Sequence, residues 1–404
     1  MDERWDVVVV GAGPAGCAAA ALLAARGRRV LLLDRGPVPH PRLCTHAIMP
    51  AGLPVLAAMG VLDEVEAAGA QRWWGVRLSV NGVRLEAPLP HGWCEYPYGL
   101  SLRRHLLDPI LLGAVRRHPV AEVRLGWCAE ALLGHDGTVT GVRARGLDGE
   151  TRRIGARLVV AADGRRSRLA RLARLPERLL PNRHTALIAY LDGVPREERP
   201  RLEGFYDRGR SASMLPADAG LRVAGVMVSP ERWPRAEWGE RMLAELCRYP
   251  GLRERLRHAR LVTRPVPVRG LRNVLRRTTR PGFAAIGDAA TQTDPAFGQG
   301  ISWALRAGNR LAEAAHAALA AGDGPVTLPP RIAWEPVFLP LFFGISLLSA
   351  VPPGSLLEQA IMASAAGSPL TVPMLRLALG LAVRPRPAPA LSTAAAWLRG
   401  AFAP

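Results

Sequence analysis

The start of the chain alternates short apolar runs with a glycine-rich turn. Residues 5–10 (WDVVVV) are rich in β-branched side chains, a pattern typical of a buried parallel strand. A segment with three glycines follows, then an alanine-rich pattern of helical type, and then a second apolar run at residues 29–33. This order of strand, helix and strand predicts an α/β unit with a parallel sheet.

Strands of a different kind follow. Residues 78–85 alternate apolar and polar side chains around an Asn-Gly pair, which is the strongest short-range signal for a hairpin. Two Asp-Gly turn signals separate the strand-like runs of residues 132–160, and residues 186–268 contain further runs, including residues 222–228. A helical pattern covers residues 237–256. We expect the runs at residues 78–85 and 186–268 to form an antiparallel β-sheet inserted into the α/β unit. The runs of residues 132–160 are consistent with a β-meander of the α/β unit itself.

The last eighty residues contain apolar helical runs separated by prolines. The longest apolar stretch, at residues 337–351, contains Pro340 and is shorter than the roughly 20 residues that a spanning helix needs. No transmembrane segment is predicted. We expect residues 326–404 to form a helical cap, with a membrane-docking tail as the alternative.

The glycine-rich turn has the form G-x-G-x-x-G and lies between a strand and a helix. In such a turn Gly11 permits the tight bend, Gly13 lets the backbone approach a pyrophosphate, and Gly16 lets the helix pack closely on the strand. Asp34 ends the second apolar run, near the spacing of about 20 residues expected for a carboxylate that binds ribose hydroxyls. The constellation predicts a dinucleotide site, for NAD or FAD.

Composition narrows the class of protein further. The 404 residues are 49% hydrophobic and 22% charged, which is ordinary globular usage. The net charge of +19 comes from 53 basic residues, all of them arginine. These arginines are scattered along the chain without interleaved aromatic residues, so no nucleic acid is predicted as a partner and no oligomeric interface is defined.

The five cysteines are far apart and form no C-x-x-C pair, which argues against a disulfide framework or a zinc site. No metal site is predicted. The first strand begins almost at once, with no apolar leader, so we expect no signal peptide. Together these features favour a reducing, cytoplasmic location.

Three further motifs lie downstream of the glycine turn. An R-x-x-L-D segment begins a helical pattern at Arg104, and the pair Asp163-Gly164 follows a buried strand pattern at residues 156–162. The pair Gly287-Asp288 is followed by residues 294–301 (DPAFGQGI). In this order and at these intervals the motifs resemble those of the p-hydroxybenzoate hydroxylase-like, FAD-dependent monooxygenases.

The resemblance implies a Rossmann-like FAD-binding domain with an inserted antiparallel β-sheet substrate domain and a C-terminal helical region. The expected FAD-binding domain is discontinuous and comprises residues 1–72, 101–180 and 276–325. The expected substrate-binding domain comprises residues 73–100 and 181–275, and its sheet should face the flavin.

The resemblance also assigns roles to individual residues. It implies that Arg104 contacts FAD, although Arg103 is an alternative, and that Asp288 binds the ribityl chain. Residues 295–300 would pass beside the isoalloxazine ring, where glycines let backbone N–H groups approach and a helix N-terminus favours negative charge. The predicted cofactor-binding residues are Gly11, Gly13, Pro14, Ala15, Gly16, Asp34, Arg35, Arg42, Arg104, Asp163, Gly164, Gly287, Asp288, Pro295, Gly298, Gln299, Gly300 and Ile301.

Other residues near these motifs have two interpretations. Arg165 and Arg166 would either receive phosphate groups of the nicotinamide coenzyme or be solvated loop arginines. Arg42 and His46 occupy a segment that related proteins place near the flavin ring. His46 is a candidate base, hydrogen-bond partner or covalent attachment point, against the alternative of a structural histidine.

By resemblance, the protein is an FAD-dependent monooxygenase that uses NADPH or NADH and oxygen, through a flavin hydroperoxide, to hydroxylate or epoxidise a small organic substrate. A natural-product substrate is expected, and hydrophobic or carrier-tethered molecules both fit. No dedicated catalytic side chain is obligatory in this chemistry, so no catalytic residue is predicted.

Three alternatives stay open to different degrees. Flavin-dependent halogenases use a lysine and a W-x-W-x-I-P segment, and this chain has neither. Geranylgeranyl reductases, which act on prenyl substrates, are the second interpretation, although their aromatic Y-x-W-x-F-P segment is absent at residues 211–216. The third is a protein that binds FAD without redox turnover.

Overall fold

The computed structural model describes residues 3–39, 44, 46–89, 95–228, 233–295, 298–330, 332 and 338–368. The predicted candidate Arg42 lies outside these residues, as does the part of the predicted cap from residue 369 onward.

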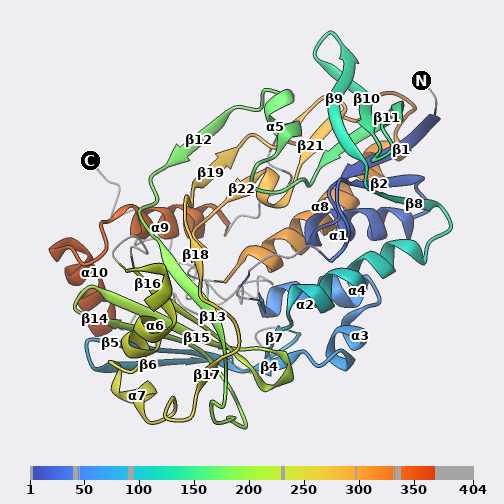
Figure 1. The fold of residues 1–404 in the computed structure, drawn as a ribbon. Coiled ribbons are helices and arrows are strands. Elements are labelled where there is room, and N and C mark those ends of the chain that lie inside the picture. Colours follow the sequence, from blue (N-terminus) through green and yellow to red (C-terminus); the bar gives the residue numbers. More distant parts are fainter. Residues whose placement is uncertain are drawn as a thin grey trace.

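A mixed sheet with a parallel centre forms the middle of the first unit (Figure 1). Its strands are β1 (Glu3–Val10), β2 (Val30–Asp34), β8 (Ala121–Leu125), β9 (Cys128–His135), β10 (Thr138–Arg145), β11 (Thr151–Ala161), β20 (Thr279–Arg280) and β21 (Phe283–Ala285). The order β21-β11-β1-β2-β8 is parallel throughout. The predicted meander is confirmed, because β9, β10 and β11 pair as successive antiparallel strands. The predicted α/β class is therefore confirmed.

Helices cover one face of this sheet, and the meander with one short helix covers the other. The helices are α1 (Pro14–Ala24), α4 (Arg104–Arg116) and α8 (Gly300–Ala320) on the first face and α5 (Arg168–Leu172) on the second. Successive side chains of a strand point to opposite faces. Val7 and Val9 accordingly pack with the three long helices, whereas Val8 and Val10 pack with the meander. The sheet is buried on both sides, as the unbroken valine run predicts.

A second large sheet lies beside the first unit (Figure 1). Its strands are β5 (Gly75–Val80), β6 (Val83–Pro88), β13 (Ala186–Asp192), β14 (Leu202–Asp207), β15 (Arg210–Pro216), β16 (Arg222–Met227), β17 (Arg260–Leu261) and β18 (Val266–Val268). Most neighbours are antiparallel, but β14 pairs with β5 in parallel. The predicted hairpin is confirmed: Val80 pairs with Val83, and both turn residues, Asn81 and Gly82, have positive φ.

The helix predicted over residues 237–256 is wrong as one element. It is divided into α6 (Trp238–Leu246) and α7 (Pro250–Arg253). Pro250 has no N–H and disfavours helical backbone in the residue before it, and Tyr249 is extended accordingly. Both helices pack on one face of the second sheet, where they cover a separate apolar core.

Short elements connect the two units. Two three-stranded sheets are formed by β3 (Ala47–Ile48), β4 (Gln71–Trp73) and β7 (Gly99–Ser101), and by β12 (Glu177–Leu180), β19 (Asn273–Arg276) and β22 (Thr291–Gln292). The helices α2 (Leu53–Ala58) and α3 (Leu62–Ala67) follow β3. Two of the predicted domain boundaries cut strands of these sheets, at residues 72/73 in β4 and 275/276 in β19.

The described part of the predicted cap contains α9 (Phe338–Ala350) and α10 (Leu356–Gly367), which lie beside the second sheet (Figure 1). A search of the described residues found no helix with both the length and the hydropathy that crossing a membrane requires.

Candidate functional site

The glycine turn joins β1 to α1 in the geometry that the sequence predicts. Gly11 has a φ of 114°, and a Cβ there would lie 2.3 Å from the carbonyl oxygen of Ala162. A Cβ on Gly16 would lie 1.9 Å from the Gly11 carbonyl oxygen. By contrast, a Cβ on Gly13 would meet nothing within 4 Å among the described residues. Gly11 and Gly16 are thus required by the fold, whereas the space beside Gly13 is open to a ligand.

Backbone donors line this open space. Gly13 is the N-cap of α1, and no described side chain caps the helix. Pro14 and Ala15 continue the first turn, and Pro14 carries no N–H to satisfy. An uncapped helix N-terminus next to open space suits a pyrophosphate. This part of the site therefore fits the diphosphate of FAD.

Asp34 lies at the end of β2 and is directed toward the glycine turn. Its carboxylate is buried and accepts the N–H of Ala12 at 2.7 Å and the N–H of Gly36 at 3.0 Å. These bonds keep the carboxylate beside the loop, where a ribose would lie. Arg35, which follows it, is exposed.

The two arginines at the start of α4 have different hydrogen-bond partners. Arg104 is buried and donates to both oxygens of Asp108, at 2.5 and 2.9 Å. It also interacts electrostatically with Asp288. Arg103 instead donates to Asp218 on the second sheet unit, through its backbone N–H at 2.9 Å and its Nε at 2.8 Å. Arg104 thus interacts with Asp108 and Asp288 of the first unit, whereas Arg103 links the start of α4 to the second unit.

In the loop after β11, the carboxylate of Asp163 accepts hydrogen bonds from residues that follow it closely in the sequence. Asp163 accepts the hydroxyl of Ser167 at 2.5 Å and the N–H groups of Arg168 and Leu169 at 2.8 and 3.2 Å. These bonds cap the start of α5. Gly164 has a φ of 81°, which favours glycine. In the structure, the Asp163 side chain therefore acts as a helix cap.

The Gly287-Asp288 pair packs directly on the glycine turn. A Cβ on Gly287 would lie 2.9 Å from the Cβ of Ala15. Asp288 is half-exposed and lies 3.8 Å from the guanidinium of Arg165. Gln292 donates to the carbonyl oxygens of Arg165, at 2.6 Å, and Asp288, at 3.2 Å. Three motifs that are far apart in the sequence thus surround one region.

The start of α8 completes this region. Gly298 has a φ of 64° and donates its N–H to the carbonyl oxygen of Pro295 at 2.9 Å. In the part of the chain that the structure describes, a Cβ on Gly300 would meet nothing within 4 Å, whereas Gln299 and Ile301 are buried. No described side chain caps α8. Its N-terminus therefore offers backbone donors next to open space, as an anionic reduced flavin requires.

Two histidines take part in contacts that the sequence did not predict. His46 is 1% exposed, has a φ of 62° and shares a hydrogen bond with the hydroxyl of Tyr190 on the second sheet. Burial, together with the nearby Arg104, lowers the pKa of His46 from 6.5 to about 3. His184 lies 3.0 Å from Asp294, which also accepts from Asn182. No local pattern signals these pairs, because their members are far apart in the sequence.

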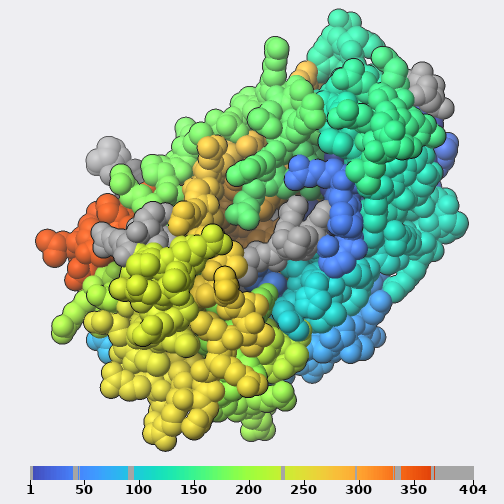
Figure 2. Space-filling model, in the orientation of Figure 1, coloured from blue at the N-terminus to red at the C-terminus, as the bar shows by residue number. Residues whose placement is uncertain are grey.

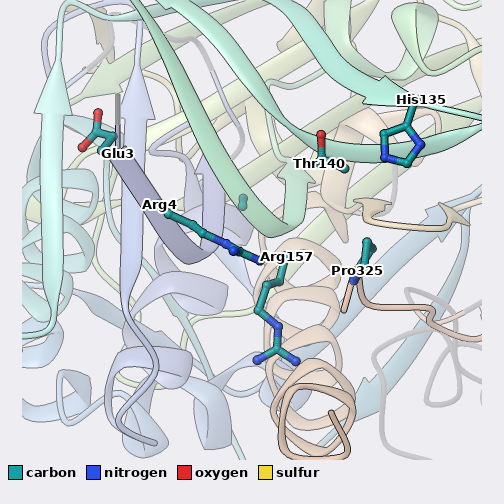
Figure 3. A pocket seen from close by; sticks show the side chains of 7 residues that line it. Glu3, Arg4, His135, Thr140, Arg157 and Pro325 are labelled. Carbon is teal, nitrogen blue, oxygen red and sulfur yellow. The ribbon is translucent and has the colours of Figure 1, made fainter. Parts of the chain in front are cut away.

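On the face shown in Figure 2, the surface is hollowed between the N-terminal, blue-to-cyan part and the green-to-yellow second unit. A separate groove of 630 Å³ lies between the start of β1, the meander and the end of α8 (Figure 3). It is lined by Arg4, His135 and Arg157, among others. None of the described cofactor candidates lines this groove.

The described residues therefore form a Rossmann-like nucleotide site in which four motifs converge, with a sheet-bearing second unit opposite. The sequence profile of the FAD binding domain family matches residues 4–325, and the chain belongs to this family. It is an FAD-dependent oxidoreductase, and NAD(P)H is the typical reductant of such enzymes. The suspected relation to FAD-dependent monooxygenases, halogenases and geranylgeranyl reductases is confirmed at the level of the superfamily.

Among curated proteins, the chain is similar to digeranylgeranylglycerophospholipid reductase 1 of Methanopyrus kandleri. The two are 30% identical over 355 residues, which cover 84% of this chain and 88% of the relative. The chain is also 36% identical to menaquinone reductase of Mycobacterium tuberculosis over 171 residues, or 42% of this chain and 40% of the relative.

Among solved structures, p-nitrophenol 4-monooxygenase of Pseudomonas putida matches with a TM-score of 0.75 and 22% identity, over 94% of this chain and 98% of the other. A flavin-dependent brominase matches with a TM-score of 0.74 and 19% identity, over 98% and 99% of the two chains. At these identities the likeness concerns the fold alone.

Proposed function

We propose that this protein is an FAD-dependent reductase that saturates carbon–carbon double bonds of a prenyl or polyene substrate, with NADPH or NADH as the source of electrons. The observation that carries the proposal is the similarity to digeranylgeranylglycerophospholipid reductases across more than four fifths of the chain. The sequence motifs alone favoured a monooxygenase. Similarity of this extent to reductases makes reduction of the substrate the better-supported reaction.

The sheet face opposite the FAD-binding unit supports an apolar substrate. In β13, Ile188 and Tyr190 belong to the side of the sheet that packs with Ala47 and Met49 of the first unit. Leu221 and other apolar residues of this cluster are only partly buried. Apolar surface with few polar groups suits a hydrocarbon chain.

The proposed cofactor contacts follow from the geometry. The N-terminus of α1 and the space at Gly13 would hold the diphosphate, Asp34 the ribose and Asp288 the ribityl chain. Arg104 would contribute positive charge, and the start of α8 would stabilise a negatively charged flavin ring. FAD, when bound, supplies the transfer of a hydride between the coenzyme and the substrate.

A monooxygenase is the second candidate function, because one observation favours it. The segment Arg210–Pro216, which is β15, lacks the aromatic residues that geranylgeranyl reductases usually show there. The motif at residues 294–301 resembles that of the monooxygenases equally well.

One experiment tests both candidates. The purified protein is reduced anaerobically with NADPH or NADH and then mixed with geranylgeraniol or, separately, with oxygen and an aromatic substrate. Reoxidation of the flavin by the prenyl alcohol, with a saturated product, supports the reductase. Oxygen consumption coupled to loss of the aromatic substrate, with no reaction of the prenyl alcohol, refutes it in favour of the monooxygenase.

A further inference from the structure

His46 and Tyr190 meet where the two large units touch. His46 follows Cys44, whose Sγ accepts the His46 N–H at 3.3 Å, and it precedes β3. Three residues further on, Met49 donates its N–H to Ser302 in the first turn of α8, at 2.7 Å. The segment that carries His46 is therefore attached to the same helix end that we propose to lie at the flavin ring. His46 and Tyr190 also stack, with ring centroids 5.7 Å apart.

Charged groups from the start of α4 and from the second unit lie near this pair. Arg103, the N-cap residue of α4, lies 5.8 Å from the centroid of the Tyr190 ring, and Arg104 and His105 interact electrostatically with His46. From the second unit, Asp218 neutralises Arg103, and within α4 Asp108 pairs with Arg104. The two arginines are thus balanced by carboxylates, and Arg103 favours the phenolate form of Tyr190 while Asp218 opposes it.

The hydrogen bonds of the pair are incomplete. Within the described residues, His46 Nδ1 is buried and has no hydrogen-bond partner. A neutral imidazole carries one N–H, and a phenol oxygen both accepts and donates. If Nε2 of His46 carries the hydrogen and donates it to Tyr190, the hydroxyl hydrogen of Tyr190 is directed elsewhere. Tyr190 is only half-buried, so a bound molecule can accept that hydrogen.

We propose that Tyr190 is the catalytic proton donor of this enzyme and that His46 positions its hydroxyl. This inference rests on the proposed reductase function. When a hydride, which FAD reduced by NADPH or NADH would supply, forms a C–H bond with one carbon, the π bond of the substrate breaks. The O–H bond of Tyr190 breaks as well, and its proton bonds to the neighbouring carbon. The product gains one hydride and one proton, and Tyr190 is left as a phenolate that later takes a proton from water.

The surroundings suit both states of the tyrosine. Burial raises the pKa of Tyr190 to about 12, against a lowering effect of Arg103, so the phenol is protonated before the step at neutral pH. Afterwards the phenolate accepts the N–H of His46, and the Arg103 guanidinium lies over the Tyr190 ring. The depressed pKa of His46 keeps its imidazole neutral, and so its role is to orient and stabilise rather than to give up a proton.

The first test uses Tyr190→Phe, which keeps the ring and removes the hydroxyl. We expect the reduction of the flavin by NADPH to be unchanged, and reoxidation by geranylgeraniol to slow by about 10²–10⁴-fold, the usual contribution of acid catalysis. His46→Gln should slow reoxidation less and leave the reductive step unchanged. The control is Tyr206→Phe, which removes a phenol of the same sheet that donates to Glu358.

The second test measures binding without turnover. The chain has five tyrosines, so fluorotyrosine-labelled protein should give five resolvable ¹⁹F signals, with that of Tyr190 assigned by its loss in Tyr190→Phe. Addition of phytanol, the saturated analogue, to the oxidised holoprotein should shift the Tyr190 signal and leave the Tyr206 signal in place.

The outcomes separate this inference from the proposed function. If wild-type protein is reoxidised by geranylgeraniol and Tyr190→Phe reacts at the wild-type rate, the proton-donor role is overturned and the reductase stands. The same holds if phytanol binds without moving the Tyr190 signal. If the wild-type protein itself is not reoxidised by the prenyl alcohol, both proposals are overturned.

Discussion

The three glycines of the turn after β1 should respond differently to substitution, and the contrast tests the cofactor site. Gly13 has extended backbone that any residue adopts, and its Cβ position is open. Gly13→Val should therefore change the stability of the apoprotein by no more than about 1 kcal/mol, the range for an N-cap change. The new side chain would occupy the space proposed for the diphosphate.

The expected loss of affinity follows from the donors involved. Each hydrogen bond from a backbone N–H to a charged phosphate contributes about 1.5–3 kcal/mol. Displacing two of them costs about 3–6 kcal/mol, which weakens FAD binding by about 10²–10⁴-fold. Gly16→Ala should behave differently, because its Cβ would overlap backbone that cannot move aside. It should lose more than about 3 kcal/mol of folding stability, an overpacking effect at the high end of its range.

The assay combines flavin content of the purified protein, a titration of apoprotein with FAD and thermal unfolding of the apoprotein. Gly251→Val is the matched control, since that glycine also has an open Cβ position but lies in α7, far from the site in sequence. If Gly13→Val binds FAD as tightly as wild type, the assignment of the diphosphate to this turn is refuted. If Gly16→Ala is as stable as wild type, the packing argument fails.

Three further predictions concern other parts of the site. His46 titrates near pH 3 when folded and near 6.5 when unfolded, so the unfolded state binds more protons between these values. Stability should fall as the pH drops below about 6.5, by on the order of 1.4 kcal/mol per pH unit, and His46→Gln should flatten this dependence in denaturant titrations. Arg104→Met leaves the buried Asp108 carboxylate unpaired and should cost about 3–5 kcal/mol in the same titrations, whereas adding Asp108→Leu should recover most of the loss. Asp288→Ala should weaken FAD binding in a fluorescence titration while the apoprotein melts as before, and unchanged affinity would argue against a ribityl contact.

Some features of this protein depend only on neighbours in the sequence. The strand, turn and helix around Gly11 and the hairpin at Asn81 were predicted because backbone preferences and side-chain alternation act over a few residues. The helix predicted over residues 237–256 was wrong for a reason that is also local: Pro250 ends the first helix and starts a second one.

The tertiary structure decided which side chains face one another. It assigned Arg103 to Asp218 and Arg104 to Asp108, a choice that adjacent arginines in the sequence leave open. The carboxylate of Asp163 caps a helix in the folded chain, whereas the motif alone suggested a cofactor contact for this residue. Both outcomes depend on what lies within a few ångströms, which the motif does not encode.

The pair of His46 and Tyr190 is the clearest example of a contact that the sequence does not predict. Its members are separated by 144 residues and belong to different units, so no spacing or periodicity brings them together. The sequence determined the cofactor class, because FAD is bound largely by short backbone motifs whose residue types are locally constrained. The surroundings of the reacting atoms arise from long-range packing of two sheets, and only the folded chain determines them.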